Sequence, residues 1–89
     1  MEQVFSVYAI DSYPCANSRH IRSHGRALKL LKLGQKVYFE HDLKIPALII
    51  EIVSYGHSFD ELEPMMGCSV TIELDVRSQL PENIEWLYG

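Results

Sequence analysis

The most restrictive feature of this sequence is a run of alternating residues from Ser69 to Val76. Aliphatic residues occupy every second position of the run, and polar or charged residues lie between them. A period of two places the aliphatic side chains on one face of an extended chain, which is typical of a half-buried strand. A second run, Ala47–Val53, is almost continuously aliphatic and also predicts a strand. Gly56, Pro64 and Gly67 lie between the two runs and indicate turns.

Two further segments have the composition of strands. Val4–Ile10 is rich in β-branched and aromatic residues, and Lys36–Leu43 alternates between apolar and polar positions. Pro46 follows the second segment and ends it, because proline cannot donate a hydrogen bond to a strand ladder. The apolar residues of Arg77–Gly89 predict a last short strand or turn. Ser58–Met65 begins with a capping residue and could form a single helical turn.

Residues 19–33 admit two interpretations. As a helix, the segment would begin after Ser18, and Gly25 would weaken it by about 1 kcal/mol relative to alanine. As a strand, it would run from His20 to Lys29, with Gly25 at a bulge or at a close approach between two backbones. Residues 30–34 would then turn the chain. We favour the strand.

Short strands at intervals of about ten residues, with turn residues between them, predict an all-β fold. We expect a small antiparallel β-barrel of about six strands, formed by residues 1–89 as a single domain. No apolar run reaches the roughly 18 residues that a membrane-spanning helix needs. The first residues include Glu2 and Asp11 and lack the basic start of a secretory signal. These observations predict no association with a membrane.

The chain contains two cysteines, Cys15 and Cys68. Small secreted domains that depend on disulfides usually contain more. We therefore expect two free thiols in a reducing, cytoplasmic setting, and a single disulfide is the alternative.

Charge is unevenly distributed along the chain, although the net charge is only −4. Residues 19–36 contain six of the eight lysines and arginines and no acid, whereas residues 37–89 contain ten of the twelve acids. The basic segment is a candidate contact surface for an acidic partner. The alternative is that its cations lie beside acidic neighbours in the fold and are neutralised by them.

Two sets of residues are candidates for binding. The basic set could follow a nucleic-acid backbone, with nearby tyrosines stacking on bases, although the acidity of the whole chain argues against it. The acidic set, with one aromatic residue, could bind a basic protein surface. The basic set is Arg19, Arg22, Arg26, Lys29, Lys32 and Lys36. The acidic set is Phe59, Asp60, Glu61, Glu63, Glu73 and Asp75.

Metal binding and catalysis have weaker support. Cys15, His20 and His24 have a zinc-like spacing, but on a strand the two histidines would be about 13 Å apart and could not bind one ion. Neither cysteine has a local signature of a catalytic nucleophile. Acidic pairs such as Glu61 and Glu63 are expected to form a solvated face. We therefore expect no metal site, no cofactor and no enzymatic activity.

Several short segments together form a recognisable pattern: Val4–Ile10, Gly25-Arg26-Ala27, residues 32–37, Ile49–Val53, Asp60-Glu61-Leu62, residues 67–74 and Ile84-Glu85. These segments are similar to motifs of the second, β-barrel domain of translational GTPases such as elongation factor Tu. Two departures are Gln35 and Cys68, which replace aspartates of that family's turns. The resemblance implies the same barrel, and it also favours a strand for residues 19–33.

In the complete factors, this domain packs on the GTPase domain and helps to hold the aminoacyl end of transfer RNA. The chain contains no G-x-x-x-x-G-K-[ST] motif, so we expect no GTP hydrolysis from it. The first functional hypothesis is a non-enzymatic module that binds a protein through its acidic face and apolar loop residues. The alternative is an accessory factor that binds RNA or the ribosome through residues 19–36.

Overall fold

The structure is a computed structural model, and it describes residues 2–12, 20–39, 46–74 and 84–89. Most of these residues lie in strands, and the described ranges contain no helix. The strands are β1 (Gln3–Ser12), β2 (His20–Ala27), β3 (Leu31–Lys32), β4 (Lys36–Tyr38), β5 (Pro46–Ser54), β6 (His57–Ser58), β7 (Glu61–Leu62), β8 (Gly67–Leu74) and β9 (Trp86–Tyr88).

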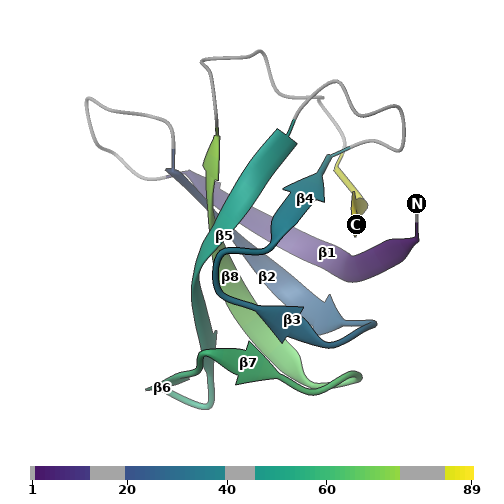
Figure 1. The fold of residues 1–89 in the computed structure, drawn as a ribbon. Helices are drawn as coiled ribbons and strands as arrows, with labels where there is room; N and C mark the ends of the chain where they lie inside the picture. The colour runs from purple at the N-terminus through teal and green to yellow at the C-terminus, as the bar shows by residue number, and fades with distance from the viewer. Residues whose placement is uncertain (1, 13–19, 40–45, 75–83) are drawn as a thin grey trace.

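Six strands form a ring in an antiparallel sheet, which confirms the all-β prediction with about six strands. Their order is β4, β9, β1, β2, β8 and β5, and β5 pairs again with β4. β6 extends the sheet beyond β5, and β3 and β7 form a separate pair. In Figure 1, β6 and β7 lie at the lower end of the molecule, where β5 ends and β8 begins.

The strand interpretation of residues 19–33 is confirmed over residues 20–27, which form β2 between β1 and β8. Gly25 lies at a close approach between backbones, as predicted, because a β-carbon there would be 1.8 Å from the carbonyl oxygen of Ser6. The bulge lies in β1, opposite Gly25, where the register shifts between Val7 and Ala9.

The helical turn expected for Ser58–Met65 is wrong, because this segment contains β6 and β7. Its backbone bonds to neighbouring strands: the Phe59 N–H donates to the Ile52 carbonyl at 2.9 Å, and the Asp60 carbonyl accepts from the Leu33 N–H at 2.9 Å. These long-range bonds replace the local bonds that a helical turn would need.

Two predicted strands differ in their bounds from the observed ones. The strand expected over Lys36–Leu43 is observed as β4, and residues 40–45 lie outside the described residues. The alternating strand is observed from Gly67 to Leu74, and its last predicted residues, 75 and 76, also lie outside them. Pro46 is the first residue of β5, a position at which proline is tolerated.

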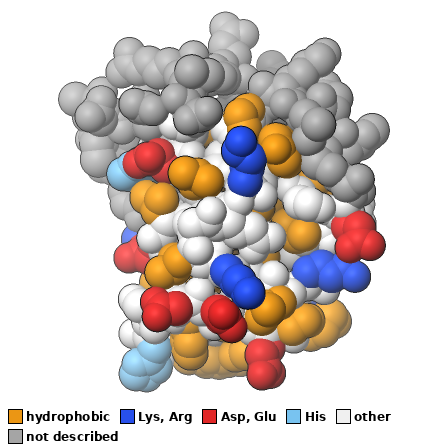
Figure 2. Space-filling model, in the orientation of Figure 1, with side chains coloured by type: hydrophobic (Ala, Val, Ile, Leu, Met, Phe, Trp, Pro, Cys, Tyr) orange, Lys and Arg blue, Asp and Glu red, His pale blue; other side chains and the backbone are white. Residues whose placement is uncertain are grey.

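On the face of the molecule shown in Figure 2, hydrophobic side chains lie among charged side chains of both signs. The described part of the chain has no helix that is long and apolar enough to cross a membrane. Large apolar side chains are nevertheless exposed at several places. They are Tyr8, Ile10, Leu30, Leu33, Leu48, Ile50, Tyr55 and Met65.

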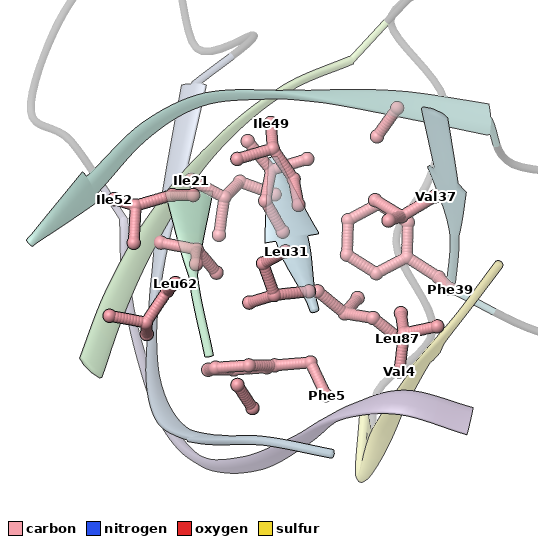
Figure 3. Packing of buried hydrophobic residues seen from close by; sticks show 14 of the residues in the cluster. Val4, Phe5, Ile21, Leu31, Val37, Phe39, Ile49, Ile52, Leu62 and Leu87 are labelled. Atoms are coloured by element: carbon pink, nitrogen blue, oxygen red, sulfur yellow. The ribbon is translucent and has the colours of Figure 1, made fainter. Parts of the chain in front are cut away.

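The hydrophobic core fills the interior of the ring (Figure 3). Strand alternation explains its composition, because every second residue of β2 is buried and the residues between are partly or fully exposed. Leu31 and Leu62, from the separate pair of strands, close the core from one side. The buried apolar residues are Val4, Phe5, Ile21, Ala27, Leu31, Val37, Phe39, Ala47, Ile49, Ile52, Leu62, Val70, Ile72, Leu74 and Leu87.

Candidate functional site

The turn between β5 and β6 presents the most exposed large apolar residue of the described chain. Ser54 pairs with His57, which leaves a two-residue turn of Tyr55 and Gly56. Both turn residues have positive φ, 51° and 77°, as a type I′ turn requires. Asparagine is favoured at the first position of such a turn, yet Tyr55 occupies it with 85% of its surface exposed.

The turn between β7 and β8 presents a second such residue. Met65 follows Pro64 and has a φ of 73°, the conformation that glycine or asparagine usually adopts in a type II turn. It is 62% exposed. The turn is held against β2, because the Met65 N–H donates to the Ala27 carbonyl at 2.7 Å and Met66 accepts from the Ala27 N–H at 3.0 Å.

Both turns lie at the lower end of the molecule in Figure 1, on either side of β6 and β7. The Ser54 hydroxyl links their bases by donating to the Gly67 carbonyl at 2.7 Å. Between the turns, Leu62 is buried and Phe59 packs against the core, so the segment is anchored from beneath. We call residues 55–65 the turn rim.

The acidic candidates are divided between two places. Asp60, Glu61 and Glu63 are exposed on the turn rim, where Glu61 lies 3.9 Å from the Lys32 ammonium group. Glu73 lies near the opposite end of β8, about 20 Å along the strand from Gly67, and accepts a hydrogen bond from His20 at 2.9 Å.

Two described candidates of the acidic set, Phe59 and Glu73, therefore do not lie at an exposed rim position. Phe59 is half-buried and packs on the core, so it supports the rim and does not project from it. Asp75 lies outside the described residues. Tyr55 was not predicted as a binding residue from the sequence, whereas Met65 is one of the apolar loop residues that the first functional hypothesis uses. The positive φ of both residues follows from the pairing of the strands on either side of each turn. Tyrosine and methionine do not by themselves indicate a positive φ, so these residue types carried no signal for the two turn tips.

The basic candidates do not form one stripe. Arg22 lies 3.7 Å from Glu51, and Lys29 lies 3.6 Å from Glu2. With the Lys32–Glu61 pair, three of the five described cations of this set have an acidic neighbour, as the neutralisation alternative predicts.

The other two described cations of that set have no ion pair with another described residue. Arg26 and Lys36 are exposed, on β2 and β4 respectively. Arg19 lies outside the described residues. This dispersed arrangement gives little support to a track for a nucleic-acid backbone.

The outer face of β2 carries a polar network that local sequence patterns do not reveal. His24 bonds to Asp11 through Nε2 and to Ser69 through Nδ1, both at 2.6 Å. A carboxylate can only accept, so Nε2–H donates to Asp11. When the imidazole is neutral, Nδ1 then accepts from the Ser69 hydroxyl. The order of carboxylate, imidazole and hydroxyl is that of a nucleophile activated by a base.

A second group of polar side chains lies beside this network. The Thr71 hydroxyl donates to Glu51 at 3.2 Å, and Glu51 also lies near Arg22. Thr71 was predicted to point outward with the other polar residues of its strand. It shares that face with Arg22 and Glu51 in the register, and these longer side chains explain why it is only 5% exposed.

Metal binding by the histidines has no support in the geometry. His20 and His24 are four residues apart on a strand, and each is bonded to its own carboxylate. The described ranges contain no group of three or more histidine, cysteine or acidic side chains that could hold an ion. Cys15 lies outside these ranges.

Cys68 is a free, half-buried thiol. Burial raises the pKa of its thiol from 9.0 to about 11, and a backbone hydrogen bond with Ala27 opposes the shift in part. The thiol is therefore protonated at neutral pH and is a poor nucleophile.

No protein-family model matches this chain, and neither a curated protein nor a solved structure matches it.

Proposed function

We propose that the chain is a non-enzymatic protein-interaction module that binds its partner through the turn rim. The observation that carries this proposal is the exposure of Tyr55 and Met65 at two turn tips, on either side of an acidic segment. Tyrosine and methionine are enriched in protein interfaces, where they fill pockets of the partner.

The charge of the rim determines what kind of partner fits it. Asp60 and Glu63 have no ion pair with another described residue, and the Glu61–Lys32 pair is long and exposed. The rim therefore presents carboxylates that a basic surface would complement. The proposed partner is a protein segment in which lysine or arginine residues flank an apolar side chain.

The test is affinity measurement with a partner captured from a lysate of the host and then purified. The variant D60K/E63K should bind at least about tenfold more weakly, because each lysine repels a basic partner. Glu85→Lys is the matched control, since Glu85 is an exposed acid near β9. An equal loss of affinity in both variants, or no loss of affinity in D60K/E63K, would contradict the proposal.

The alternative, binding of RNA or the ribosome through residues 19–36, is distinguished by nuclease treatment in the same capture. Captured material that is lost after nuclease treatment, and that is less abundant with the variant R26A, would support the RNA-binding alternative. The ion pairs of Arg22, Lys29 and Lys32 favour the protein partner. We place the module in the cytoplasm, because a sequence with two cysteines suits a reducing compartment.

We also propose that the ring of strands is a barrel of the kind found in the second domain of translational GTPases. Two observations support this relationship. Six strands follow one another around the ring, and Gly34 turns the chain with a φ of 81° within residues 32–37, one of the segments that are similar to that family. An experimental structure in which β4 and β9 are separated by a gap in the ladder would contradict closure.

A further inference from the structure

We propose that Ser69 is an acylation site, a hydroxyl that His24 and Asp11 activate toward acyl donors. The three side chains come from different strands: Asp11 from β1, His24 from β2 and Ser69 from β8. The strand register brings them together, because His24 pairs with Ala9 on one side and with Ser69 on the other. This site lies on the outer face of the sheet, where Val53 of β5 lies between Ser69 and Ser58 of the turn rim in the strand register.

Each residue of the group has a definite role. Asp11 accepts the Nε2–H proton at 2.6 Å, which fixes the imidazole tautomer and stabilises the imidazolium that forms during reaction. Nδ1 is then unprotonated and faces the Ser69 hydroxyl at 2.6 Å, where it can act as a general base. Ser69 is thus the nucleophile, His24 the base and Asp11 the positioning residue.

The chemical surroundings distinguish Ser69 from other serines. Ser54 donates to a carbonyl oxygen, which does not act as a base, and Ser23 is fully buried with no hydrogen-bond partner among the described residues. Ser69 is half-buried, and the His24 and Asp11 side chains are 37% and 68% exposed. A small acyl donor can therefore reach the hydroxyl from solvent.

The proposed reaction is a single acyl transfer. The Ser69 Oγ attacks the acyl carbon, its proton passes to His24 Nδ1, and the bond from the acyl carbon to the leaving group breaks. The leaving group then takes the proton from His24. β8 is paired with β2 on one side and with β5 on the other, so its N–H groups face these ladders and are not directed at an oxyanion on Ser69. We therefore expect the acyl group to remain on Ser69 without rapid turnover.

The probe is p-nitrophenyl acetate. The expected result is a burst of one nitrophenolate released per chain. Peptide mass spectrometry should then locate one acetyl group on Ser69. H24Q should lower the rate of this acetylation about 100-fold, because a positioned general base contributes at least that factor. D11N should lower it less. Acidic buffer should suppress it, because a protonated imidazole cannot accept the hydroxyl proton.

Two controls test whether the reactivity of Ser69 comes from its activation by His24, and not from simple exposure of a hydroxyl or from misfolding of the variants. Tyr8→Phe removes an exposed hydroxyl of β1 and should leave the burst unchanged. Ser69→Ala should abolish it while the midpoint of thermal unfolding stays close to that of the native chain. Acetylation of lysines or tyrosines alone, or acetylation of Ser69 at the same rate in H24Q, would overturn the proposal.

Discussion

The carbonyl oxygen of Ser6 occupies the space that a β-carbon on residue 25 would need. The separation would be 1.8 Å, and the Phe5 ring would lie 3.1 Å away. Both obstacles are fixed, because one is backbone and the other belongs to a fully buried side chain. Glycine at this position therefore allows β1 and β2 to pair closely around the bulge in β1.

Gly25→Ala should consequently destabilise the fold by at least about 3 kcal/mol, since the strands must separate to admit the methyl group. Urea unfolding followed by circular dichroism measures this change. Gly67→Ala is the matched control, because its β-carbon would meet only the Gly25 carbonyl oxygen, at an ordinary 3.8 Å. Similar losses of unfolding free energy in the two variants would show that the close approach of β1 and β2 at Gly25 does not cause the destabilisation.

Removing two buried serine hydroxyls should have opposite effects. The Ser23 hydroxyl is fully buried and has no hydrogen-bond partner within the described part of the chain, so Ser23→Ala should raise the free energy of unfolding by about 1 kcal/mol. The Ser54 hydroxyl donates to the Gly67 carbonyl at 2.7 Å, so Ser54→Ala should lower it by about 1 kcal/mol. Denaturant unfolding of both variants checks the signs. A loss of stability in Ser23→Ala would mean that its hydroxyl has a partner in solution.

Tyr55→Asn should stabilise the fold and weaken binding of the proposed partner. Asparagine suits the positive φ of the turn, so the expected gain is about 1 kcal/mol. Binding should weaken because an exposed aromatic anchor is lost. Thermal unfolding and affinity measurement give the two readouts, and Tyr55→Phe should leave both nearly unchanged. If Tyr55→Asn binds normally, this tyrosine is not part of the interface, whatever its effect on stability.

Cys68 should make stability depend on pH in alkaline solution. The pKa of its thiol is about 11 in the folded chain and 9.0 when unperturbed, so the unfolded chain loses the proton first as pH rises. The contribution to stability is complete below pH 9.0 and declines as the pH approaches 11. Cys68→Ala should remove this part of the decline, as unfolding measured in Cys15→Ser chains would show. An unchanged pH profile would mean that the thiol titrates normally in the fold.

Alternation along each strand was sufficient to predict much of the core. Val70, Ile72 and Leu74 are buried as their spacing indicates, because the side-chain period of a strand is a local property of the backbone. The same reasoning failed at Thr71, which has the outward position of its strand but is covered by residues of two neighbours. Burial could thus be predicted from the sequence where it depends only on the alternation of side chains along one strand.

The amino-acid sequence by itself determined the strands β1, β5 and β8, the turns at Gly34 and Gly56, and the inner face of β8. The tertiary structure decided which strands are neighbours, and therefore every contact of the candidate sites. His24 and Ser69 are 45 residues apart in the sequence and meet only because β2 pairs with β8. The physical reason is that a hydrophobic period specifies a face of a strand, whereas pairing and register depend on how all the strands close around one core.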